Sequence, residues 1–394
     1  MSAARKGTIM LYRSFGHTGE KVSVLGFGAM RLPVVDHHHD NIDAPRAREM
    51  LRYAIDHGVN YVDTAYPYHG TSIDKKGTCE PFLGEALSGG YREKVLLATK
   101  LHPLAVHTRA DMDRILAGQL KDLRTDHVDC YLLHGIGGAT WTKFRDLGVV
   151  EFLDSALADG RIRYAGFSFH DHLEAFNEIV DAYDWSFCQI QYNYMDLEFQ
   201  AGLAGLRHAA ERGLGVIIME PLKGGRLAAE GPPEVQSIWG AAPVRRTPAE
   251  WGLRYVWDDP GVSMLLSGMS TMDQLVENLA TADEALPGSL DAADLELIGK
   301  VRQVYSERLQ VDCTACRYCM PCPAGIDIPM LFGLLNNASL YDSAGTEKFI
   351  YGIEKTLGTT KNASDCTECG QCVEACPQGI EVPEMLKEFV REFE

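Results

Sequence analysis

The chain has 394 residues, of which 46% are hydrophobic and 23% charged, and this composition excludes an intrinsically disordered protein. Its 37 basic and 55 acidic residues give a formal net charge of −18, which argues against nucleic acid as a partner. No apolar stretch predicts a membrane span, and residues 1–15 lack the apolar region of a signal peptide. We therefore expect a cytoplasmic protein with one large and one smaller domain.

Residues 20–285 alternate short apolar runs with amphipathic stretches, and the pattern occurs eight times. Such a repeat predicts a (β/α)8 TIM barrel. A doubly wound dinucleotide-binding fold is the alternative, but Arg31 stands where its glycine fingerprint has a third glycine. The expected strands are residues 22–28, 61–63, 95–100, 128–134, 162–168, 187–191, 215–219 and 262–267. The expected helices are residues 45–57, 80–87, 109–123, 143–158, 172–183, 201–212, 248–257 and 272–285.

A domain boundary is predicted at Pro287 and Gly288, because this pair interrupts the pattern. Residues 1–286 then form the barrel, and residues 287–394 form a smaller C-terminal domain. A helix over residues 291–308 leads into a region that holds eight of the 11 cysteines.

Four polar residues stand at the ends of three successive predicted strands, or just after them: Asp63, Tyr68, Lys100 and His134. Active sites of barrels of this kind lie at the C-terminal ends of the strands. A tyrosine, with a free pKa near 10, is a poor acid at neutral pH unless a cation stabilises its phenolate. Lys100 can supply that cation, held by Asp63, while His134 donates a hydrogen bond to a carbonyl oxygen. Tyr68 then acts as the general acid, although each residue alone also fits a structural role.

Residues 10–285 resemble the aldo-keto reductase family. The run Asp-Thr-Ala-x-x-Tyr from Asp63 to Tyr68, the strand-terminal Lys100 and the Leu-Leu-His that ends at His134 match the catalytic tetrad of that family. The resemblance implies an NAD(P)-dependent oxidoreductase that acts on a small-molecule carbonyl or alcohol.

The resemblance also implies cofactor-binding residues. Gln189 matches the glutamine that binds the nicotinamide carboxamide, and Ser168 matches the serine that assists it. Phe169 stands where asparagine is usual, and Met219 takes the place of a stacking aromatic residue. The loop with Leu222 and Gly224 resembles the loop that covers the pyrophosphate.

Residues 267–278 resemble the segment that binds the adenosine end of the cofactor, but they lack the basic residues that normally pair with a 2′-phosphate. We therefore expect weak NADPH selectivity or none. A strong preference for NADPH would indicate that another residue, such as Lys223 or Arg226, supplies the charge. The matching residues of the segment are Ser267, Met269, Gln274, Glu277 and Asn278.

The clustered cysteines form two similar runs, each of which ends in Cys-Pro. The second run fits the spacing of bacterial ferredoxins, and the first has one residue fewer before its last cysteine. Two [4Fe-4S] clusters in a mainly helical, ferredoxin-like domain are therefore predicted. Zinc sites and disulfides are alternatives, but closely spaced Cys-Pro runs favour iron–sulfur chemistry and disulfide frameworks belong to secreted proteins. The eight predicted ligands are Cys313, Cys316, Cys319, Cys322, Cys366, Cys369, Cys372 and Cys376.

In two-cluster ferredoxins the fourth cysteine of each run binds the other cluster. Cys376 is therefore predicted to complete the first site and Cys322 the second. The residues between the runs are expected to be helical.

Three roles for the clusters remain open: structural support, electron transfer with a redox partner protein, and redox sensing. Nicotinamide moves two electrons as a hydride, whereas each cluster exchanges one, so direct exchange needs a converter such as a flavin. An electron-transfer or redox-sensing protein whose barrel holds FMN, or no longer turns over carbonyl compounds, is therefore the alternative function.

Overall fold

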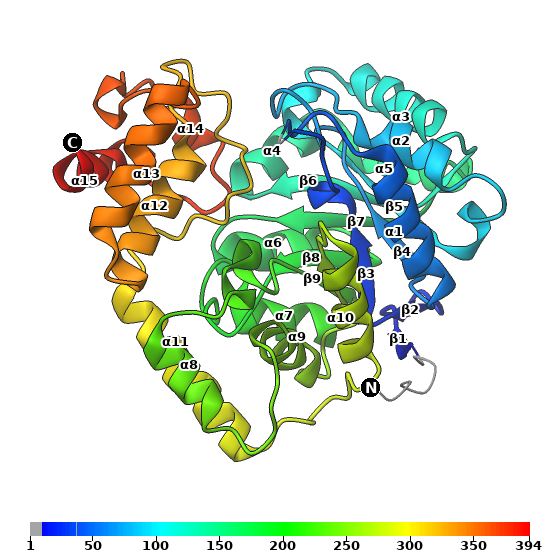
Figure 1. Cartoon of the computed structure of the whole chain (residues 1–394). Helices are drawn as coiled ribbons and strands as arrows, with labels where there is room; N and C mark the ends of the chain where they lie inside the picture. The colour runs from blue at the N-terminus through cyan, green and yellow to red at the C-terminus, as the bar shows by residue number, and fades with distance from the viewer. Residues whose placement is uncertain (1–9, 37) are drawn as a thin grey trace. The chain divides into compact units, whose positions relative to one another are not determined.

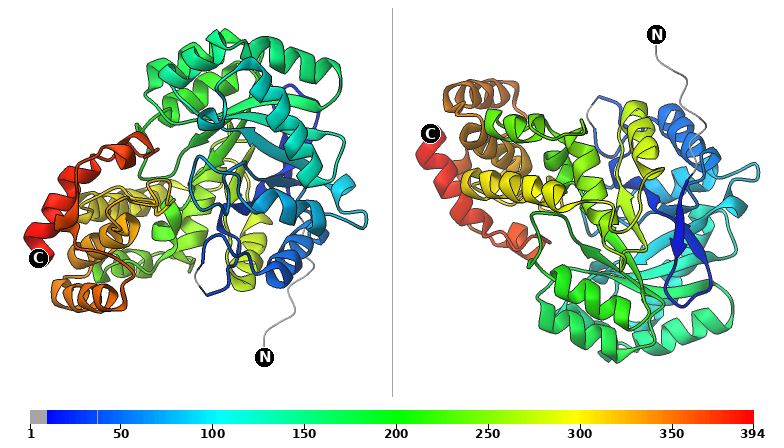
Figure 2. Two further views of the ribbon diagram at one scale, coloured as in Figure 1. Left: turned by 90° about the horizontal axis from the view of Figure 1, so that it is seen from above. Right: turned by 90° about the horizontal axis from the view of Figure 1, so that it is seen from below.

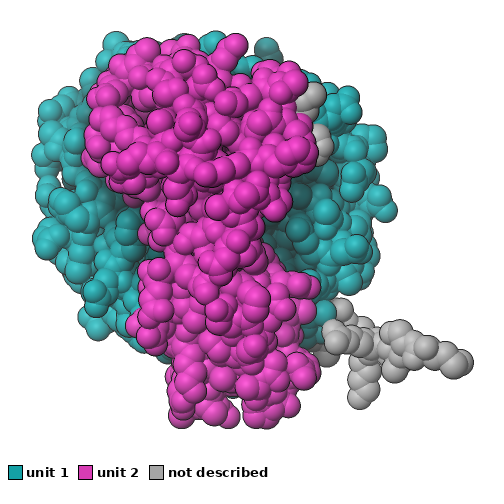
Figure 3. All heavy atoms as spheres, turned by 60° about the vertical axis from the view of Figure 1, so that its left-hand side comes forward, with its two compact units in different colours: residues 1–221, 253–289 teal, residues 222–252, 290–394 magenta. Residues whose placement is uncertain are grey.

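The computed structural model describes residues 10–36 and 38–394, so the prediction for residues 1–15 falls mostly outside the described residues. Two compact units make up the chain (Figure 3): Met1–Pro221 with Leu253–Ser289, and Leu222–Gly252 with Leu290–Glu394. Residues 222–252 therefore group with the C-terminal part of the chain, and the domain boundary near Pro287 remains a prediction. Among the described helices, none is both long and apolar enough to cross a bilayer.

The first unit contains a closed barrel of eight parallel strands, which confirms the predicted (β/α)8 fold (Figure 1). The strands are β3 (Leu25–Gly28), β4 (Tyr61–Asp63), β5 (Leu96–Leu101), β6 (Val128–Ile136), β7 (Ile162–Phe169), β8 (Phe187–Gln191), β9 (Gly215–Met219) and β10 (Met264–Ser267). They follow one another around the barrel in chain order, and β10 closes it by pairing with both β3 and β9.

Helices surround these strands (Figure 2), because parallel neighbours need crossover connections. The helix α3 (Arg109–Leu123) shows how the sequence specifies them. Thr108 and Asp111 form a capping box at its start, and Met112, Ile115 and Leu116 are buried at helical spacing. The other α-helices of the barrel region are α1 (Ala44–Asp56), α2 (Cys79–Ala86), α4 (Gly138–Asp146), α5 (Val149–Ala158), α6 (Leu173–Ala182), α7 (Gly202–Glu211), α9 (Pro248–Asp258) and α10 (Met272–Ala282).

Two predicted elements are divided in the structure. The helix expected over residues 143–158 is two helices, α4 and α5, because Gly148 between them has a φ of +77° and interrupts the helical backbone. The strand expected over residues 22–28 is divided into β2 (Lys21–Ser23) and β3. β2 pairs antiparallel with β1 (Tyr12–Ser14), a strand that the sequence analysis did not predict.

The segment between β1 and β2 fills the N-terminal end of the barrel with an aromatic side chain. Phe15 is fully buried, and its ring centroid lies 6.1 Å from that of Tyr61 and 5.1 Å from that of Phe187. Tyr61 and Phe187 are the first residues of β4 and β8. This end of the barrel is therefore an apolar core, and the predicted site residues lie at the opposite end of the strands.

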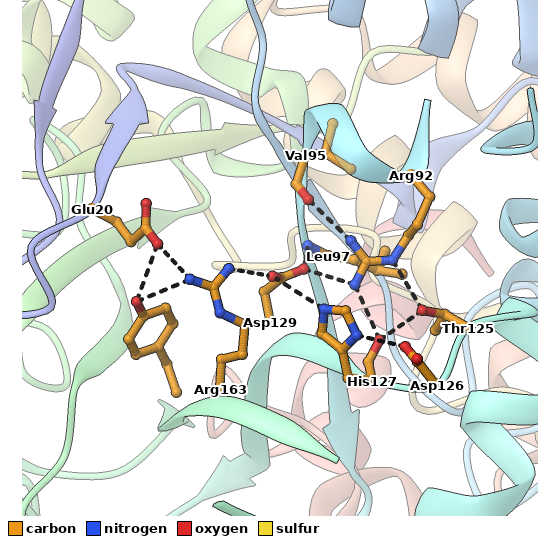
Figure 4. A network of polar contacts seen from close by, with 10 residues as sticks. Glu20, Arg92, Val95, Leu97, Thr125, Asp126, His127, Asp129 and Arg163 are labelled. Atoms are coloured by element: carbon orange, nitrogen blue, oxygen red, sulfur yellow. Dashed lines mark hydrogen bonds and ion pairs between the residues drawn. The ribbon is translucent and has the colours of Figure 1, made fainter. Parts of the chain in front are cut away.

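A buried carboxylate joins three strands near their N-terminal ends (Figure 4). Asp129 on β6 is 2% exposed and accepts a hydrogen bond of 2.9 Å from the backbone N–H of Leu97 on β5. It also pairs at 2.8 Å with Arg92 and at 2.8 Å with Arg163 on β7. Arg163 extends the network to Glu20 at 2.6 Å. Polar groups at this face of a barrel act in stability rather than catalysis.

We expect the substitution Asp129→Asn to lower the free energy of unfolding by about 2–3 kcal/mol, because two guanidinium groups lose a charged acceptor. Urea unfolding followed by the near-ultraviolet circular dichroism of the buried tryptophans measures this change. Asp126→Asn is the matched control, since the Asp126 side chain is 96% exposed. Equal urea midpoints for the two variants would contradict a stabilising role for Asp129.

The second unit is mainly helical, and the helical segment predicted between the cysteine runs is present as two helices. Leu331, Leu335 and Tyr351 belong to a buried apolar core, against which several cysteines of both runs pack. The helices of this unit are α8 (Pro233–Gly240), α11 (Ala292–Arg308), α12 (Ile328–Leu340), α13 (Ala344–Leu357), α14 (Gln371–Glu374) and α15 (Val382–Phe393).

Helix α8 was not predicted, although two signals in the sequence mark it. Pro233 stands at the first helical position, where proline is favoured. Val235 and Trp239 are spaced by four residues, and both are buried.

Candidate active site and cysteine clusters

The four predicted catalytic residues lie together at the C-terminal end of the barrel. Asp63 ends β4, Lys100 lies on the neighbouring β5, and His134 lies on β6. Tyr68 lies in the loop that follows β4. All four are buried: Lys100 is 0% exposed, Asp63 2%, His134 5% and Tyr68 7%.

The Lys100 ammonium connects Asp63 to Tyr68. Its Nζ donates to the two carboxylate oxygens of Asp63 at 2.6 and 2.7 Å and to the carbonyl oxygen of Thr64 at 2.8 Å. It also donates to the Tyr68 hydroxyl oxygen at 3.3 Å. Because Lys100 supplies the proton of that last bond, the Tyr68 hydroxyl keeps its own proton for another acceptor.

Burial and the ion pair have opposite effects on the charge states of Lys100 and Asp63. Burial lowers the pKa of Lys100 and raises the pKa of Asp63, whereas their mutual attraction favours both charged forms. A buried lysine without such a partner would lose its proton more readily. Asp63 therefore keeps a cation beside the Tyr68 hydroxyl.

His134 faces Tyr68 in an uncharged form. The two ring centroids are 6.0 Å apart in an edge-on arrangement. Burial lowers the pKa of His134 well below its ordinary value, and the neighbouring His102 and Lys100 lower it further. A neutral imidazole can donate one hydrogen bond from a ring nitrogen, so His134 can polarise a carbonyl group without transferring a proton.

Two further histidines at this end of the barrel were not singled out from the sequence. His102 follows β5, and its ring centroid lies 5.0 Å from that of His134. His170 follows β7 and contacts Gln200 at 3.2 Å. Burial lowers the pKa of each to about 4, so both are neutral at neutral pH. Each lies two residues beyond a predicted site residue, Lys100 or Ser168, and this position is the signal that identifies them.

The predicted carboxamide-binding residues lie on the neighbouring strands β7 and β8. Ser168 accepts a hydrogen bond of 2.7 Å from the backbone N–H of Gly135. Gln189 donates from its Nε2 to the Met219 sulfur at 3.6 Å, while its buried Oε1 has no hydrogen-bond partner among the described residues. A buried acceptor left open is costly, so Oε1 fits a ligand that brings an N–H donor, as a carboxamide does.

The predicted adenosine-end residues are held at the end of β10 and on α10. Asn278 donates to the Ser267 hydroxyl at 3.0 Å. The Gln274 side chain accepts from the backbone N–H of Ser270 at 2.9 Å and completes the capping box of α10. Met269 is buried and Glu277 half-buried. Gln274 therefore already has a structural role, whereas the role of this segment in cofactor binding remains a prediction.

Arg31 is a cation close to this segment that the sequence analysis did not connect with it. A Cβ atom placed on Gly268 would lie 3.2 Å from the Arg31 side chain, and Ser270 donates to the Arg31 carbonyl at 2.8 Å. The Arg31 guanidinium pairs with Glu220 at 3.5 Å. Arg31 and Gly268 are 237 positions apart in the sequence, and they come close because β3 and β10 are neighbours in the barrel.

Leu222 and Gly224, the two predicted residues of the pyrophosphate loop, belong to the second unit. They lie at the start of the short 3-10 helix η4 (Lys223–Ala228), whose neighbours in that unit are residues of the first cysteine run. The role of Leu222 and Gly224 in covering the pyrophosphate therefore remains a prediction.

None of the eight clustered cysteines forms a disulfide in the described structure. Burial raises the pKa of Cys319, and the neighbouring thiols that add to this rise are Cys316, Cys313 and Cys376. Burial likewise raises the pKa of Cys372, and there the neighbouring thiols are Cys366, Cys322 and Cys369. Each group thus contains three cysteines of one run and the last cysteine of the other.

A cavity lies at the second of these groups. Its lining includes Cys322, Cys366, Cys369 and Cys372, together with Cys319 of the first run. Among the described residues, no three histidine, cysteine or acidic side chains converge as ligands of a single metal ion do. The thiolates of a [4Fe-4S] cluster bind four separate irons, and a donor set of four cysteines around a cavity fits that larger group.

Comparison with known families matches both parts of the chain. Residues 24–290 match the Aldo/keto reductase family, and residues 312–381 match the 4Fe-4S dicluster domain. The second match includes all eight clustered cysteines.

Individual relatives agree with the first match. The chain is 31% identical over 235 residues to the "Uncharacterized oxidoreductase YrpG" of Bacillus subtilis, covering 55% of this chain and 68% of the relative. It is 27% identical to the L-galactose dehydrogenase of Arabidopsis thaliana, covering 75% of this chain and 92% of the relative. The solved aldo-keto reductase AKR11C1 of Bacillus halodurans, in its holo form, superposes with a TM-score of 0.61 at 26% identity, covering 74% and 96% of the two chains. The chain therefore belongs to the aldo/keto reductase family of oxidoreductases and carries a 4Fe-4S dicluster domain after its barrel.

Proposed function

We propose that the chain reduces a small-molecule carbonyl compound to an alcohol, or oxidises the alcohol, with NADH or NADPH. The observation that supports this proposal is the buried Lys100 ammonium, which lies 2.6 Å from the Asp63 carboxylate and 3.3 Å from the Tyr68 hydroxyl. This arrangement stabilises a phenolate, and stabilising the conjugate base makes the tyrosine a usable acid near neutral pH.

Each residue of the tetrad then has one task during carbonyl reduction. Tyr68 donates its hydroxyl proton to the carbonyl oxygen as negative charge develops there. His134, neutral and buried, donates a hydrogen bond to the same oxygen. Lys100 stabilises the phenolate that Tyr68 becomes, and Asp63 holds Lys100 in its charged form. In the oxidation direction the phenolate accepts the alcohol proton.

Two residues of the barrel are suited to the nicotinamide ring. When bound, the nicotinamide supplies or accepts the hydride. The open Oε1 of Gln189 can accept from the carboxamide N–H, and the Ser168 hydroxyl can donate to the carboxamide oxygen. Phe169 is fully buried and offers no hydrogen bond where the family pattern has asparagine.

A flavin such as FMN in the barrel is the second candidate, and the observation that favours it is the altered pair Phe169 and Met219. With a flavin, the clusters and the barrel could exchange single electrons. The chain would then be an electron-transfer or redox-sensing protein.

For the C-terminal domain we propose two [4Fe-4S] clusters that exchange electrons, one at a time, with a redox partner protein. The eight cysteines form no disulfide in the described structure, and the neighbours of Cys319 and Cys372 include thiols of both runs, which supports this assignment. Such thiols require a reducing compartment, and we propose the cytoplasm.

Analysis of protein purified without oxygen tests these proposals together. We expect about eight irons and eight sulfides per chain, no stoichiometric flavin, and binding of NADH or NADPH. Stoichiometric flavin without nucleotide binding would establish the second candidate instead. Zinc in place of iron would contradict the cluster assignment.

We also expect the dissociation constants of NADH and NADPH to differ by less than about tenfold, which is about 1.4 kcal/mol. Glu220 already neutralises Arg31, the cation near the predicted adenosine end. Glu220→Gln leaves that charge available and should increase the preference for NADPH several-fold. Fluorescence titration of both nucleotides measures the ratio. A preference above about 100-fold in the unmodified protein would show that another cation, such as Lys223 or Arg226, pairs with the phosphate.

A further inference from the structure

The loop predicted to cover the cofactor pyrophosphate lies against the first cysteine run within the second unit. Lys223, whose side chain is 2% exposed, pairs with Asp312 at 3.5 Å. A Cβ atom on Gly224 would lie 2.3 Å from the carbonyl oxygen of Thr314, so only glycine permits this approach. Asp312 and Thr314 flank Cys313 in the sequence. The contact therefore brings η4 to the edge of the first cluster site.

Arg226 lies on the same short helix η4, three residues after Lys223, and its side chain is half-buried. Burial lowers the pKa of Arg226, and the groups that counter this effect include Cys313 and Asp312. An arginine stays protonated in proteins, so its charge is permanent. Because Arg226 is partly shielded from water, salt screens its interaction with a nearby thiolate less than that of an exposed charge.

A hydrogen bond to sulfur also places positive charge next to Cys313. The backbone N–H of Ala315 donates to Cys313 Sγ at 3.4 Å. Arg317 also lies in this run, but its charge is matched by Asp327 at 3.1 Å. Arg226 and the Ala315 N–H thus add positive charge on the side of Cys313.

The second run has an acidic surrounding. Asp365 precedes it and Glu368 lies within it, both are exposed, and Glu368 lines the cavity at Cys366 and Cys369. Lys387 pairs with Glu368 at 3.1 Å and offsets one of these charges. Cys369 is itself exposed, whereas the other seven clustered cysteines are partly buried.

We propose that Arg226 gives the cluster at the first cysteine run the higher reduction potential of the two. The inference rests on the proposed pair of [4Fe-4S] clusters. Reduction adds one negative charge to a cluster, so a nearby cation and N–H donors to sulfur favour the reduced form, and carboxylates disfavour it. The first electron given by a chemical reductant then resides at the first run. That run contacts the loop expected to cover the cofactor.

A redox titration of the full-length protein, monitored by electron paramagnetic resonance with dithionite and mediators, tests the proposal. We expect two potentials, and we expect Arg226→Gln to shift the higher one to a more negative value while the lower one is unchanged. Arg226→Lys keeps the positive charge, so the higher potential should stay close to that of the unmodified protein. Lys348→Gln is the matched control, because it removes an exposed positive charge from α13 in the same unit.

A second substitution keeps the proposal testable if Arg226→Gln does not fold. Glu368→Gln should shift the lower potential to a more positive value and leave the higher one unchanged. An unchanged higher potential in Arg226→Gln, or equal shifts of both centres, would overturn the proposal. Iron and sulfide are measured in each sample, so absence of clusters is recognised separately as failure of the proposed function.

Discussion

Replacement of Tyr68 by phenylalanine should lower kcat/KM for carbonyl reduction about 100- to 10,000-fold. The substitution removes the hydroxyl that lies 3.3 Å from Lys100 Nζ and leaves the ring, its packing and the Lys100–Asp63 pair in place. Binding of NADH or NADPH and the visible absorption of the clusters should not change. Steady-state assays with para-nitrobenzaldehyde as the probe carbonyl, with nucleotide binding measured separately, check the result.

Tyr66→Phe is the matched control for this experiment. Tyr66 lies in the same loop and is half-buried, whereas the hydrogen bonds of Lys100 Nζ go to Asp63, Thr64 and Tyr68. It should keep nearly the activity of the unmodified protein. If Tyr68→Phe retained normal turnover, Tyr68 would not be the acid, and the reductase function assigned to this site would be wrong.

Removal of the Cys376 thiol should reduce the iron content from about eight to about four per chain, because a site with three thiolates leaves its cluster prone to loss. The expectation follows from the grouping of Cys376 with Cys319 rather than with its own run. The iron contents of double variants show which cysteines bind the same cluster. Cys319→Ala with Cys376→Ala should still leave about four irons, since both thiols serve one cluster. Cys372→Ala with Cys376→Ala should leave almost none.

Iron and sulfide analysis of anaerobic samples measures these contents. Cys188→Ala is the control, because Cys188 is a buried thiol of the barrel outside both runs, and it should keep about eight irons. The opposite pattern, in which the Cys372 and Cys376 pair keeps half of the iron, would contradict the interleaved assignment.

The barrel and the tetrad were predictable because the information for them is local. Strand-length apolar runs alternate with stretches of helical periodicity, and the tetrad residues stand at or near the ends of these runs. Once the strands are in order, Asp63, Lys100 and His134 must come from neighbours. The cysteine runs were predictable for the same reason, since their spacing carries the ligand pattern.

Features that depend on closure of the barrel or on tertiary packing could not be predicted in this way. Arg31 approaches Gly268 only because β10 pairs with β3. The grouping of residues 222–252 with the cysteine domain depends on contacts such as that between Lys223 and Asp312. The interruption at Gly148 was in principle readable, but glycine also occurs within helices, and only its φ of +77° shows that the helix ends.

Deuterium transfer tests the proposed chemistry most directly. NADH or NADPH deuterated at the hydride-bearing carbon is supplied with para-nitrobenzaldehyde under anaerobic conditions, and the alcohol is analysed by mass spectrometry. Direct transfer at the Tyr68 site predicts one deuterium on the carbinol carbon for each nucleotide oxidised. Alcohol without deuterium, formed while the nucleotide is consumed, would contradict direct hydride transfer and indicate a carrier that exchanges with water.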